Sequence, residues 1–381
     1  MDGSGPRVAL VSSSYFPDIG GVEQHTAQVA RELLGRGYAV EVWTVDRGRA
    51  SVRTQVQGVT VRYLPTPLPT LSPRGVVSFL RKVPSAFREW AWARRDFHPD
   101  VLHVHCFGPN GVYAEALGRL SRIPRVVSSH GETYMDDHDV YGRSLVLRTA
   151  LRAALRGARA VTACSPEVAA DLRARFDAGE VRIVPNGVTT PASGPREPRA
   201  ERRVILAAGR LEHNKGFDLL IEALPLLSEH VGLDIVGSGS QEEALRSRAR
   251  ELGLEERVRF LGPTSPSGVL QAMADADVVV VPSRKEPFGI VVLEAWAAGT
   301  PVVATSVAGP ASFVTDGQDG LLVDPRDPRA LAGALQRVLE DDGLWRSLAS
   351  GGRRTVRRYT WSAVVDEYVT TYPGPDRPTP V

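Results

Sequence analysis

Short apolar runs alternate with longer amphipathic stretches along most of the chain. Apolar runs separated by helical patterns predict a parallel sheet covered by helices. The first half has strand-like runs at residues 7–13, 39–44, 101–106, 125–129, 160–163 and 181–184. Gly20-Gly21 opens an amphipathic stretch, and Ser165-Pro166 is typical of a helix start because a capping hydroxyl precedes proline. The first half is therefore predicted to be a doubly wound α/β domain.

The second half repeats this alternation after a break. Residues 188–203 are rich in Pro, Gly and Arg and lack an apolar period, which predicts a linker between domains at 1–187 and 204–360. Strand-like runs then lie at residues 204–208, 233–236, 258–261, 278–281, 302–305 and 321–323, with helical stretches after Gly216, Ser240, Ser267, Gly289 and Asp327. Two Rossmann-like domains in series predict a cleft faced by the carboxyl ends of both sheets.

Composition agrees with this reading. The 381 residues are 43% hydrophobic and 24% charged, enough for two domains of ordinary size. A net charge of +2 carries no nucleic-acid signature. Cys106 and Cys164 lie in apolar runs, which suits reduced thiols and a cytoplasmic location. No signal peptide is recognised at the N-terminus, and no run approaches the ~18 apolar residues of a spanning helix.

Two charged pairs in the second half indicate a site for an anion and a sugar. Arg210 and Lys215 lie in GRLEHNKG, and Glu286 and Glu294 lie in SRKEPFGIVVLE. The second segment leads from an apolar strand through a tight turn into a helix, whose first N–H groups can face an anion. The two carboxylates, one before the turn and one about 1.5 turns into the helix, can accept from hydroxyls.

The pattern Glu-x-Phe-Gly-x4-Glu, preceded by Gly-Arg-x4-Lys-Gly, resembles the donor site of the retaining GT-B glycosyltransferases of family 4. The resemblance covers nearly the whole chain. It implies two Rossmann-like domains facing a central cleft, with a final helix at about 361–381 rejoining the N-terminal, acceptor-side domain. The residues after 373 are expected to be disordered.

The resemblance also implies roles for single residues. Arg210 and Lys215 would neutralise the donor diphosphate, Glu286 would hold the sugar hydroxyls and Glu294 would bind the ribose. On the N-terminal side, His130 would contact the donor sugar near the reacting carbon, although a lone histidine is more often structural. The rest of the implied donor site comprises Gly20, Gly21, Pro287, Phe288, Gly289, Ile290, Gly237 and Leu261.

We therefore predict a retaining, metal-independent hexosyltransferase that takes a nucleotide diphosphate sugar and an alcohol acceptor and needs no cofactor. UDP is favoured as the donor nucleotide on prevalence alone. His103 and His105 alternate on one strand, but a structural or cleft-lining role is favoured over a metal site. The acidic run at 136–139 is similar to a metal-binding DxD motif and is discounted in a chain with two Rossmann-like domains.

The acceptor prediction rests on charge. Glu132, Asp136, Asp137 and Asp139 follow His130, and such a cluster would attract a cationic ligand. One hypothesis is that the acceptor is an aminocyclitol or aminosugar of antibiotic biosynthesis. The alternative is that these acidic residues belong to a solvated loop and bind no ligand. Glu23 and Gln24, in a first helical turn, are also predicted to face the acceptor.

Other classes stay open. A lipid or phosphorylated-polyol acceptor is the main alternative, because residues 74–95 form a basic amphipathic stretch, interrupted by Pro84, of the kind that lies on anionic lipid. The same stretch equally fits a helix that covers the sheet. A sugar-nucleotide epimerase or a non-catalytic nucleotide-sugar-binding protein would share the two-domain plan. A dehydrogenase is disfavoured because it would need a Gly-x-Gly-x-x-Gly turn after a strand, and residues 237–239 supply only Gly-x-Gly.

Overall fold

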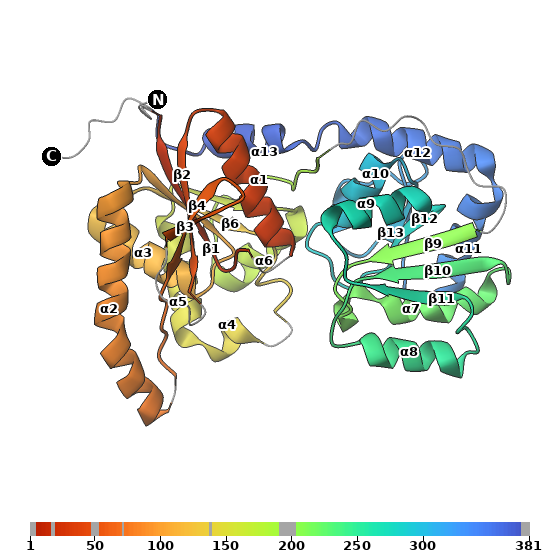
Figure 1. The fold of residues 1–381 in the computed structure, drawn as a ribbon, viewed down its shortest axis with the longest axis horizontal. Coiled ribbons are helices and arrows are strands. Elements are labelled where there is room, and N and C mark those ends of the chain that lie inside the picture. Colours follow the sequence, from red (N-terminus) through yellow and green to blue (C-terminus); the bar gives the residue numbers. More distant parts are fainter. Residues whose placement is uncertain are drawn as a thin grey trace. The chain divides into compact units, whose positions relative to one another are not determined.

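The computed structural model describes residues 5–16, 20–46, 53–70, 72–136, 139–189 and 203–374. The chain divides into two compact units, which we call unit 1 (Met1–Asn186 with Trp361–Val381) and unit 2 (Gly187–Thr360) (Figure 1). Each unit contains a mainly parallel sheet with helices packed on it, which confirms the predicted α/β class. Most of the predicted linker and of the predicted disordered tail lies outside the described residues.

The sheet of unit 1 has the order β3-β4-β2-β1-β5-β6-β7-β8. Only β3 runs antiparallel, against β4. The sequence pattern missed these two strands, which form a hairpin through Gln57 and Gly58, both with positive φ. The strands are β1 (Arg7–Ser12), β2 (Ala39–Val45), β3 (Arg53–Val56), β4 (Val59–Leu64), β5 (Val101–His105), β6 (Arg125–Ser129), β7 (Ala160–Ala163) and β8 (Arg182–Ile183).

Helices follow most strands of unit 1. They are α1 (Gly21–Gly35), α2 (Pro73–Phe97), α3 (Pro109–Ser121), α4 (Val140–Arg143), α5 (Leu145–Gly157), α6 (Pro166–Phe176) and α13 (Trp361–Val369). The predicted cap of α6 is confirmed, since Ser165 Oγ accepts from Val168 N at 3.3 Å. α2 continues through Pro84, because one missing N–H removes a single hydrogen bond from a long helix. In the described chain no helix has both the length and the apolarity needed to cross a bilayer.

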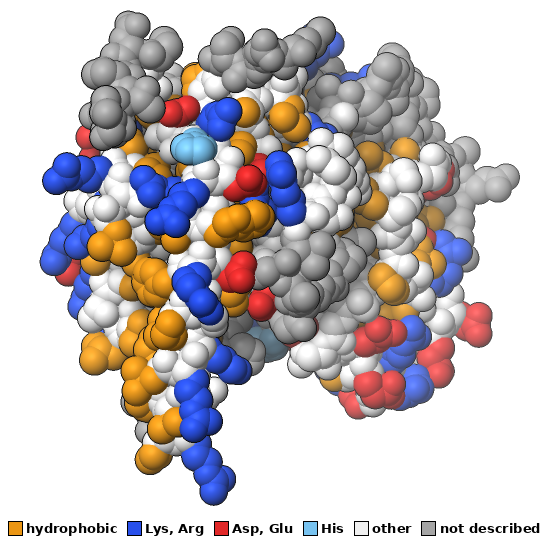
Figure 2. Space-filling view, turned by 60° about the vertical axis from the view of Figure 1, so that its left-hand side comes forward, with side chains coloured by type: hydrophobic (Ala, Val, Ile, Leu, Met, Phe, Trp, Pro, Cys, Tyr) orange, Lys and Arg blue, Asp and Glu red, His pale blue; other side chains and the backbone are white. Residues whose placement is uncertain are grey.

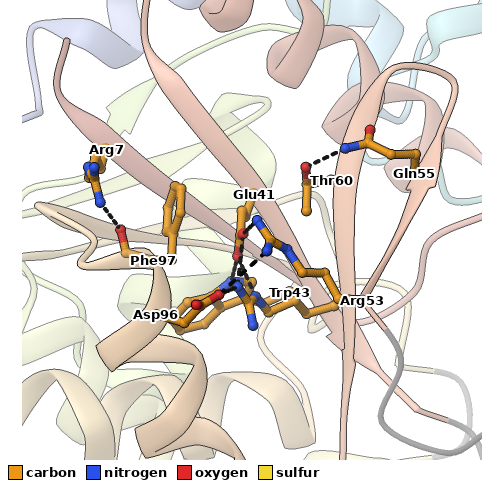
Figure 3. Close-up of polar contacts among 9 residues, drawn as sticks. Arg7, Glu41, Trp43, Arg53, Gln55, Thr60, Asp96 and Phe97 are labelled. Atoms are coloured by element: carbon orange, nitrogen blue, oxygen red, sulfur yellow. Dashed lines mark hydrogen bonds and ion pairs between the residues drawn. The ribbon is translucent and has the colours of Figure 1, made fainter. Parts of the chain in front are cut away.

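A buried ion cluster fixes the C-terminal half of α2 to the sheet (Figure 3). Arg62 and Glu41, on β4 and β2, are each about 2% exposed and pair at 2.5 Å between Nε and Oε2. Asp96, near the end of α2, also pairs with Arg62. Trp43 donates its indole N–H to Glu41 at 3.0 Å. Because each buried charge has an opposite partner, the cluster avoids the large cost of an unpaired ion in the core.

The last helix, α13, belongs to the core of unit 1. Val364, Val365 and Tyr368 pack with residues of β1, α1 and β2. His25 Nε2 lies 3.1 Å from the Tyr368 hydroxyl, and His103 Nδ1 lies 2.7 Å from that of Tyr372. The segment that ends the described chain is therefore joined to the first helix and to a central strand by buried hydrogen bonds.

Unit 2 has the strand order β11-β10-β9-β12-β13-β14, and every pairing is parallel. All six predicted strands are confirmed within two residues. The strands are β9 (Arg203–Ala208), β10 (Val231–Val236), β11 (Val258–Gly262), β12 (Val278–Val281), β13 (Val302–Thr305) and β14 (Leu321–Val323). The helices are η1 (His213–Lys215), α7 (Phe217–Ala223), η2 (Leu224–Leu226), α8 (Glu242–Glu251), α9 (Pro266–Asp275), α10 (Ile290–Ala298), η3 (Gly309–Ser312), α11 (Pro328–Glu340) and α12 (Asp342–Val356).

Replacing Tyr372 with Phe should lower the free energy of unfolding by about 1–3 kcal/mol, because His103 Nδ1 would remain buried without its partner. Urea unfolding followed by tryptophan fluorescence measures this. The control is Tyr38→Phe, since the Tyr38 ring neighbours that of Tyr372 but its hydroxyl has no hydrogen bond within the described chain. Equal effects of the two changes would show that the Tyr372 hydroxyl contributes nothing specific.

Candidate active site

The strand order of unit 2 reverses at β9, which has β10 on one side and β12 on the other. In open α/β sheets, ligands bind beyond the carboxyl ends of the strands at such a reversal, because the connections leave in opposite directions. Both predicted charged segments begin there. Arg210 follows β9, and Glu286 follows β12.

A glycine allows these two segments to touch. Gly216 has φ +69°, and a Cβ at this position would lie 2.0 Å from the carbonyl oxygen of Pro282. The backbone N–H groups of Arg284 and Lys285 donate to Asn214 O at 2.8 and 3.2 Å. The turn before α7 is thus bound to the loop after β12, and any side chain at 216 would separate them.

A second contact braces the same loop. The Arg284 guanidinium donates to both carboxylate oxygens of Asp218, in the first turn of α7, at 2.7 and 2.6 Å. This pairing lowers the pKa of Asp218 despite its partial burial. No role was predicted for either residue. Their only signal was opposite charge in two segments already predicted to meet.

Lys215 and Glu286 form an ion pair within this frame. Lys215 Nζ lies 2.6 Å from Glu286 Oε2, which also accepts from Ser283 Oγ at 3.2 Å. The side chains are 18% and 10% exposed. Glu286 Oε1 has no hydrogen bond to any described residue. The pair therefore presents a cation and an unused acceptor oxygen at one point of the sheet edge.

The loop from Glu286 to Gly289 is held by close packing. Phe288 is buried and stacks on Phe313, with ring centroids 4.6 Å apart. Gly309 N donates to Glu286 O at 2.8 Å, and a Cβ on Gly309 would lie 2.7 Å from the Phe288 backbone. Gly289, with φ +101°, then turns the chain into α10. Pro287 and Ile290 flank this turn, and the first N–H groups of the helix lack intrahelical partners.

Glu294 lies on α10, one turn after Ile290. Burial raises the pKa of its carboxyl to about 7, and no cation among the described residues pairs with it. Near neutral pH this group is therefore present in both forms and can accept from, or donate to, a hydroxyl.

The other predicted donor residues line the ends of β9, β10 and β11. A Cβ on Gly237 would lie 1.9 Å from Gly209 O, and Gly237 N donates to Gly262 O at 3.0 Å. Leu261 is 48% exposed. Arg210 is exposed, and no carboxylate of the described chain pairs with it. An unpaired cation and an exposed apolar side chain are thus available here to a charged, aromatic ligand.

In unit 1 the loop before α1 carries the predicted glycines. Gly20 is the N-cap of α1, and a Cβ there would lie 2.6 Å from Glu23 Oε2. Gly21 begins the helix. Glu23 is buried and accepts a hydrogen bond from Ser14, so its carboxylate folds back on the loop, whereas Gln24 is half-buried. Residues 17–19 lie outside the described residues.

His130 follows β6, is half-buried and lies against the buried imidazoles of His25 and His105. Its Nε2 lies 3.0 Å from His105 Nδ1, and its ring centroid lies 4.4 Å from that of His25. Burial lowers the pKa of His130 to about 4 and that of His103 to about 3, so both are neutral at physiological pH. His103 uses both ring nitrogens, bonding Tyr372 and Ser128, as a structural role requires.

One nitrogen each of His25, His105 and His130 lies within 4.8 Å of the others, a spacing that suits a shared cation. Both nitrogens of His25 are engaged, however, with Asn186 Oδ1 at 2.8 Å and with the Tyr368 hydroxyl. A metal bound to His25 would have to displace one of these two contacts. Hydrogen bonding accounts for this ring without a ligand.

The acidic loop has mostly local partners. Glu132 accepts from Phe107 N, His130 N and Ser129 Oγ, each at 2.9 Å, and burial raises its pKa. Asp136 accepts from Val140 N and Tyr141 N, at the start of α4. Asp137 lies outside the described residues. Glu132 and Asp136 thus stabilise the backbone, and their contact with an acceptor stays a prediction.

Known proteins resemble this chain over nearly its full length. The family "Glycosyltransferase Family 4" matches residues 19–191, and "Glycosyl transferases group 1" matches residues 192–355. The D-inositol 3-phosphate glycosyltransferase of Acidothermus cellulolyticus is 32% identical, over 96% of this chain and 90% of its own.

Solved structures agree with these matches. Sucrose-phosphate synthase of Thermosynechococcus elongatus has a TM-score of 0.80 and 26% identity, covering 96% of this chain and 98% of its own. HepE of Anabaena, solved in complex with UDP-glucose, has a TM-score of 0.74 and 23% identity, with coverage of 96% and 98%. The latter likeness bears on the fold alone.

The buried histidines predict a loss of stability in acid. The folded-state pKa values of His103 and His130, about 3 and about 4, lie below the ordinary 6.5, so the unfolded chain binds more protons below that pH. Their contribution is complete above pH 6.5 and is lost as the pH falls towards the folded values. Each histidine should lower the free energy of unfolding by about 1.4 kcal/mol per pH unit in this window.

Urea unfolding at several pH values between 7.5 and 5 measures this slope. His130→Asn should make it shallower by about one proton. His230→Asn, which changes an exposed side chain of unit 2, is the control and should leave the slope unchanged. A slope insensitive to His130→Asn would mean that this imidazole takes up a proton without unfolding.

Proposed function

The chain belongs to glycosyltransferase family 4, and on this basis we propose that it moves a hexosyl group, with retention of configuration, from a nucleoside diphosphate sugar to an alcohol. The observation that carries the proposal is the Lys215–Glu286 pair, 2.6 Å apart at the strand reversal of unit 2. It offers a cation for a diphosphate beside a carboxylate oxygen for a sugar hydroxyl. UDP is the favoured nucleotide because HepE, a protein of the same fold, was solved with UDP-glucose.

The proposed chemistry is electrostatic. When the bond between the sugar carbon and the phosphate oxygen breaks, the diphosphate gains charge, which Arg210, Lys215 and the first N–H groups of α10 stabilise. The departing phosphate oxygen takes the proton of the acceptor hydroxyl. Glu286 orients the sugar, Glu294 binds the ribose, and the neutral His130 imidazole contacts the sugar. These roles need neither a metal ion nor a covalent nucleophile.

For the acceptor, a phosphorylated polyol is now favoured over an aminocyclitol or aminosugar. The relative from Acidothermus cellulolyticus is a D-inositol 3-phosphate glycosyltransferase, and inositol phosphate is a phosphorylated polyol. The cationic alternative loses support because Glu132 and Asp136 already accept hydrogen bonds from neighbouring backbone and side-chain groups. A turnover assay with both acceptor classes separates them.

Arg210→Ala and Lys215→Ala should each lower turnover by about 10²–10³, the scale for losing one preorganised charge contact. Thermal shift with UDP, GDP and ADP identifies the nucleotide, and release of that diphosphate from its sugar nucleotides measures turnover. Lys82→Ala, a lysine change outside the proposed site, is the control. Parallel losses of activity and melting temperature would assign the two cations a structural role.

The two glutamates should separate kinetically. Glu294→Ala should mainly raise the KM for the donor, because a ribose contact is equal in the ground and transition states. Glu286→Gln should mainly lower kcat, because it disturbs the group that orients the sugar during bond breaking. Initial rates over a donor series measure both. The reverse pattern would exchange the roles, and unchanged kinetics in both variants would remove the donor site from this place.

A further inference from the structure

Most side chains in the N-terminal half of α2 are exposed, and the others are half-buried. No residue from 72 to 85 is buried, whereas Ala86, Trp90, Ala93 and Phe97 in the second half are. Only the second half is fixed by the ion cluster of Arg62 and Asp96. Figure 1 shows the N-terminal end of α2 extending beyond the sheet of unit 1.

This exposed half carries apolar side chains on one face. Val76, Val77 and Leu80 are 42%, 48% and 60% exposed. Val76, Leu80, Val83 and Phe87 recur at intervals of three and four residues, which places them on one face of a helix. The core-facing pattern of α2 thus continues past the point where the sheet can cover it.

Cations lie on the helix surface away from this apolar face. Arg74, Arg81 and Arg88 follow one another at intervals of seven, Lys82 adds a fourth charge, and residues 72–88 contain no acid. All four side chains are exposed. Along the projecting helix in Figure 2, hydrophobic side chains line one edge, and Lys and Arg line the other.

We propose that residues 73–88 of α2 dock on the surface of an anionic lipid bilayer. The helix would lie in the plane of the interface, with its apolar face among the acyl chains and its cations on the lipid phosphates. Each cation near an anionic surface strengthens binding about fivefold. Long cationic side chains reach headgroups from the helix flanks because their aliphatic stems tolerate the apolar boundary.

The positive charge of this helix favours an anionic bilayer over a second copy of the chain as its binding partner. In a symmetric dimer the same patch meets itself, so the cations at 74, 81 and 88 of one copy would lie against those of the other. Juxtaposed like charges oppose such a contact. A bilayer rich in anionic headgroups satisfies the cations and covers the apolar stripe together. This inference does not rest on the proposed function, because it concerns no residue of the donor site.

Cosedimentation of the full chain with lipid vesicles tests the proposal. We expect binding to phosphatidylcholine vesicles that contain phosphatidylglycerol, weakening with salt, and little binding to pure phosphatidylcholine. The double variant Arg81→Gln/Lys82→Gln should weaken binding by about 25-fold, at about fivefold for each cation. Val76→Ser/Leu80→Ser should weaken it by about tenfold or more, through lost apolar burial.

Matched controls come from exposed positions elsewhere. Arg357→Gln/Arg358→Gln removes two adjacent exposed cations of unit 2, and Leu120→Ser removes a leucine that is 77% exposed. Neither should alter vesicle binding. The proposal is overturned by equal binding to neutral and anionic vesicles, by no binding at low salt, or by equal effects of the test and control variants. Self-association that the α2 variants abolish while vesicle binding persists would assign the face to a second copy.

Discussion

One buried imidazole joins the two segments of the chain that build unit 1. His25 lies on α1, and its two ring nitrogens meet Asn186, where the chain leaves the unit, and Tyr368, on the helix with which the chain returns. Unit 2, from Gly187 to Thr360, is thus inserted in the sequence between two residues that both bind the His25 ring. The ring is neutral in this setting, because desolvation and the neighbouring His130 and His103 all lower its pKa.

The same ring connects the stability of unit 1 to its candidate site. His130 packs edge-on against His25 and bonds His105, so a predicted contact to the sugar is held by the network that fixes the last helix. A residue so placed cannot move without disturbing the core. Its orientation is set before any ligand arrives, which is what preorganisation of a site requires.

The sequence patterns predicted the elements whose position depends on residues that are neighbours in the chain. Buried parallel strands are continuous apolar runs, so their positions in both units followed from hydrophobicity. The hairpin of β3 and β4 was missed because its strands include charged residues such as Arg62, which is buried only through its ion pair with Glu41 on the neighbouring β2. The negative charges at 132 and 136 predicted a ligand, yet both carboxylates accept hydrogen bonds from nearby backbone N–H groups. These partners depend on the three-dimensional path of the loop, which cannot be deduced from its composition.

The charged motif of unit 2 is also a packing motif. Gly216 allows the Lys215 turn to touch Pro282, and Gly309 allows a second loop to touch Phe288, so the glycines determine which charges meet. Without a ligand, Lys215 and Glu286 neutralise each other, which lowers the cost of their partial burial. A diphosphate that binds Lys215 must compete with this carboxylate. If Lys215 shifts towards phosphate, Glu286 Oε2 loses a donor that a sugar hydroxyl can replace. Under the proposed function, recognition of phosphate and recognition of sugar are therefore coupled through one ion pair, and neither half of the donor gains its full binding energy without the other.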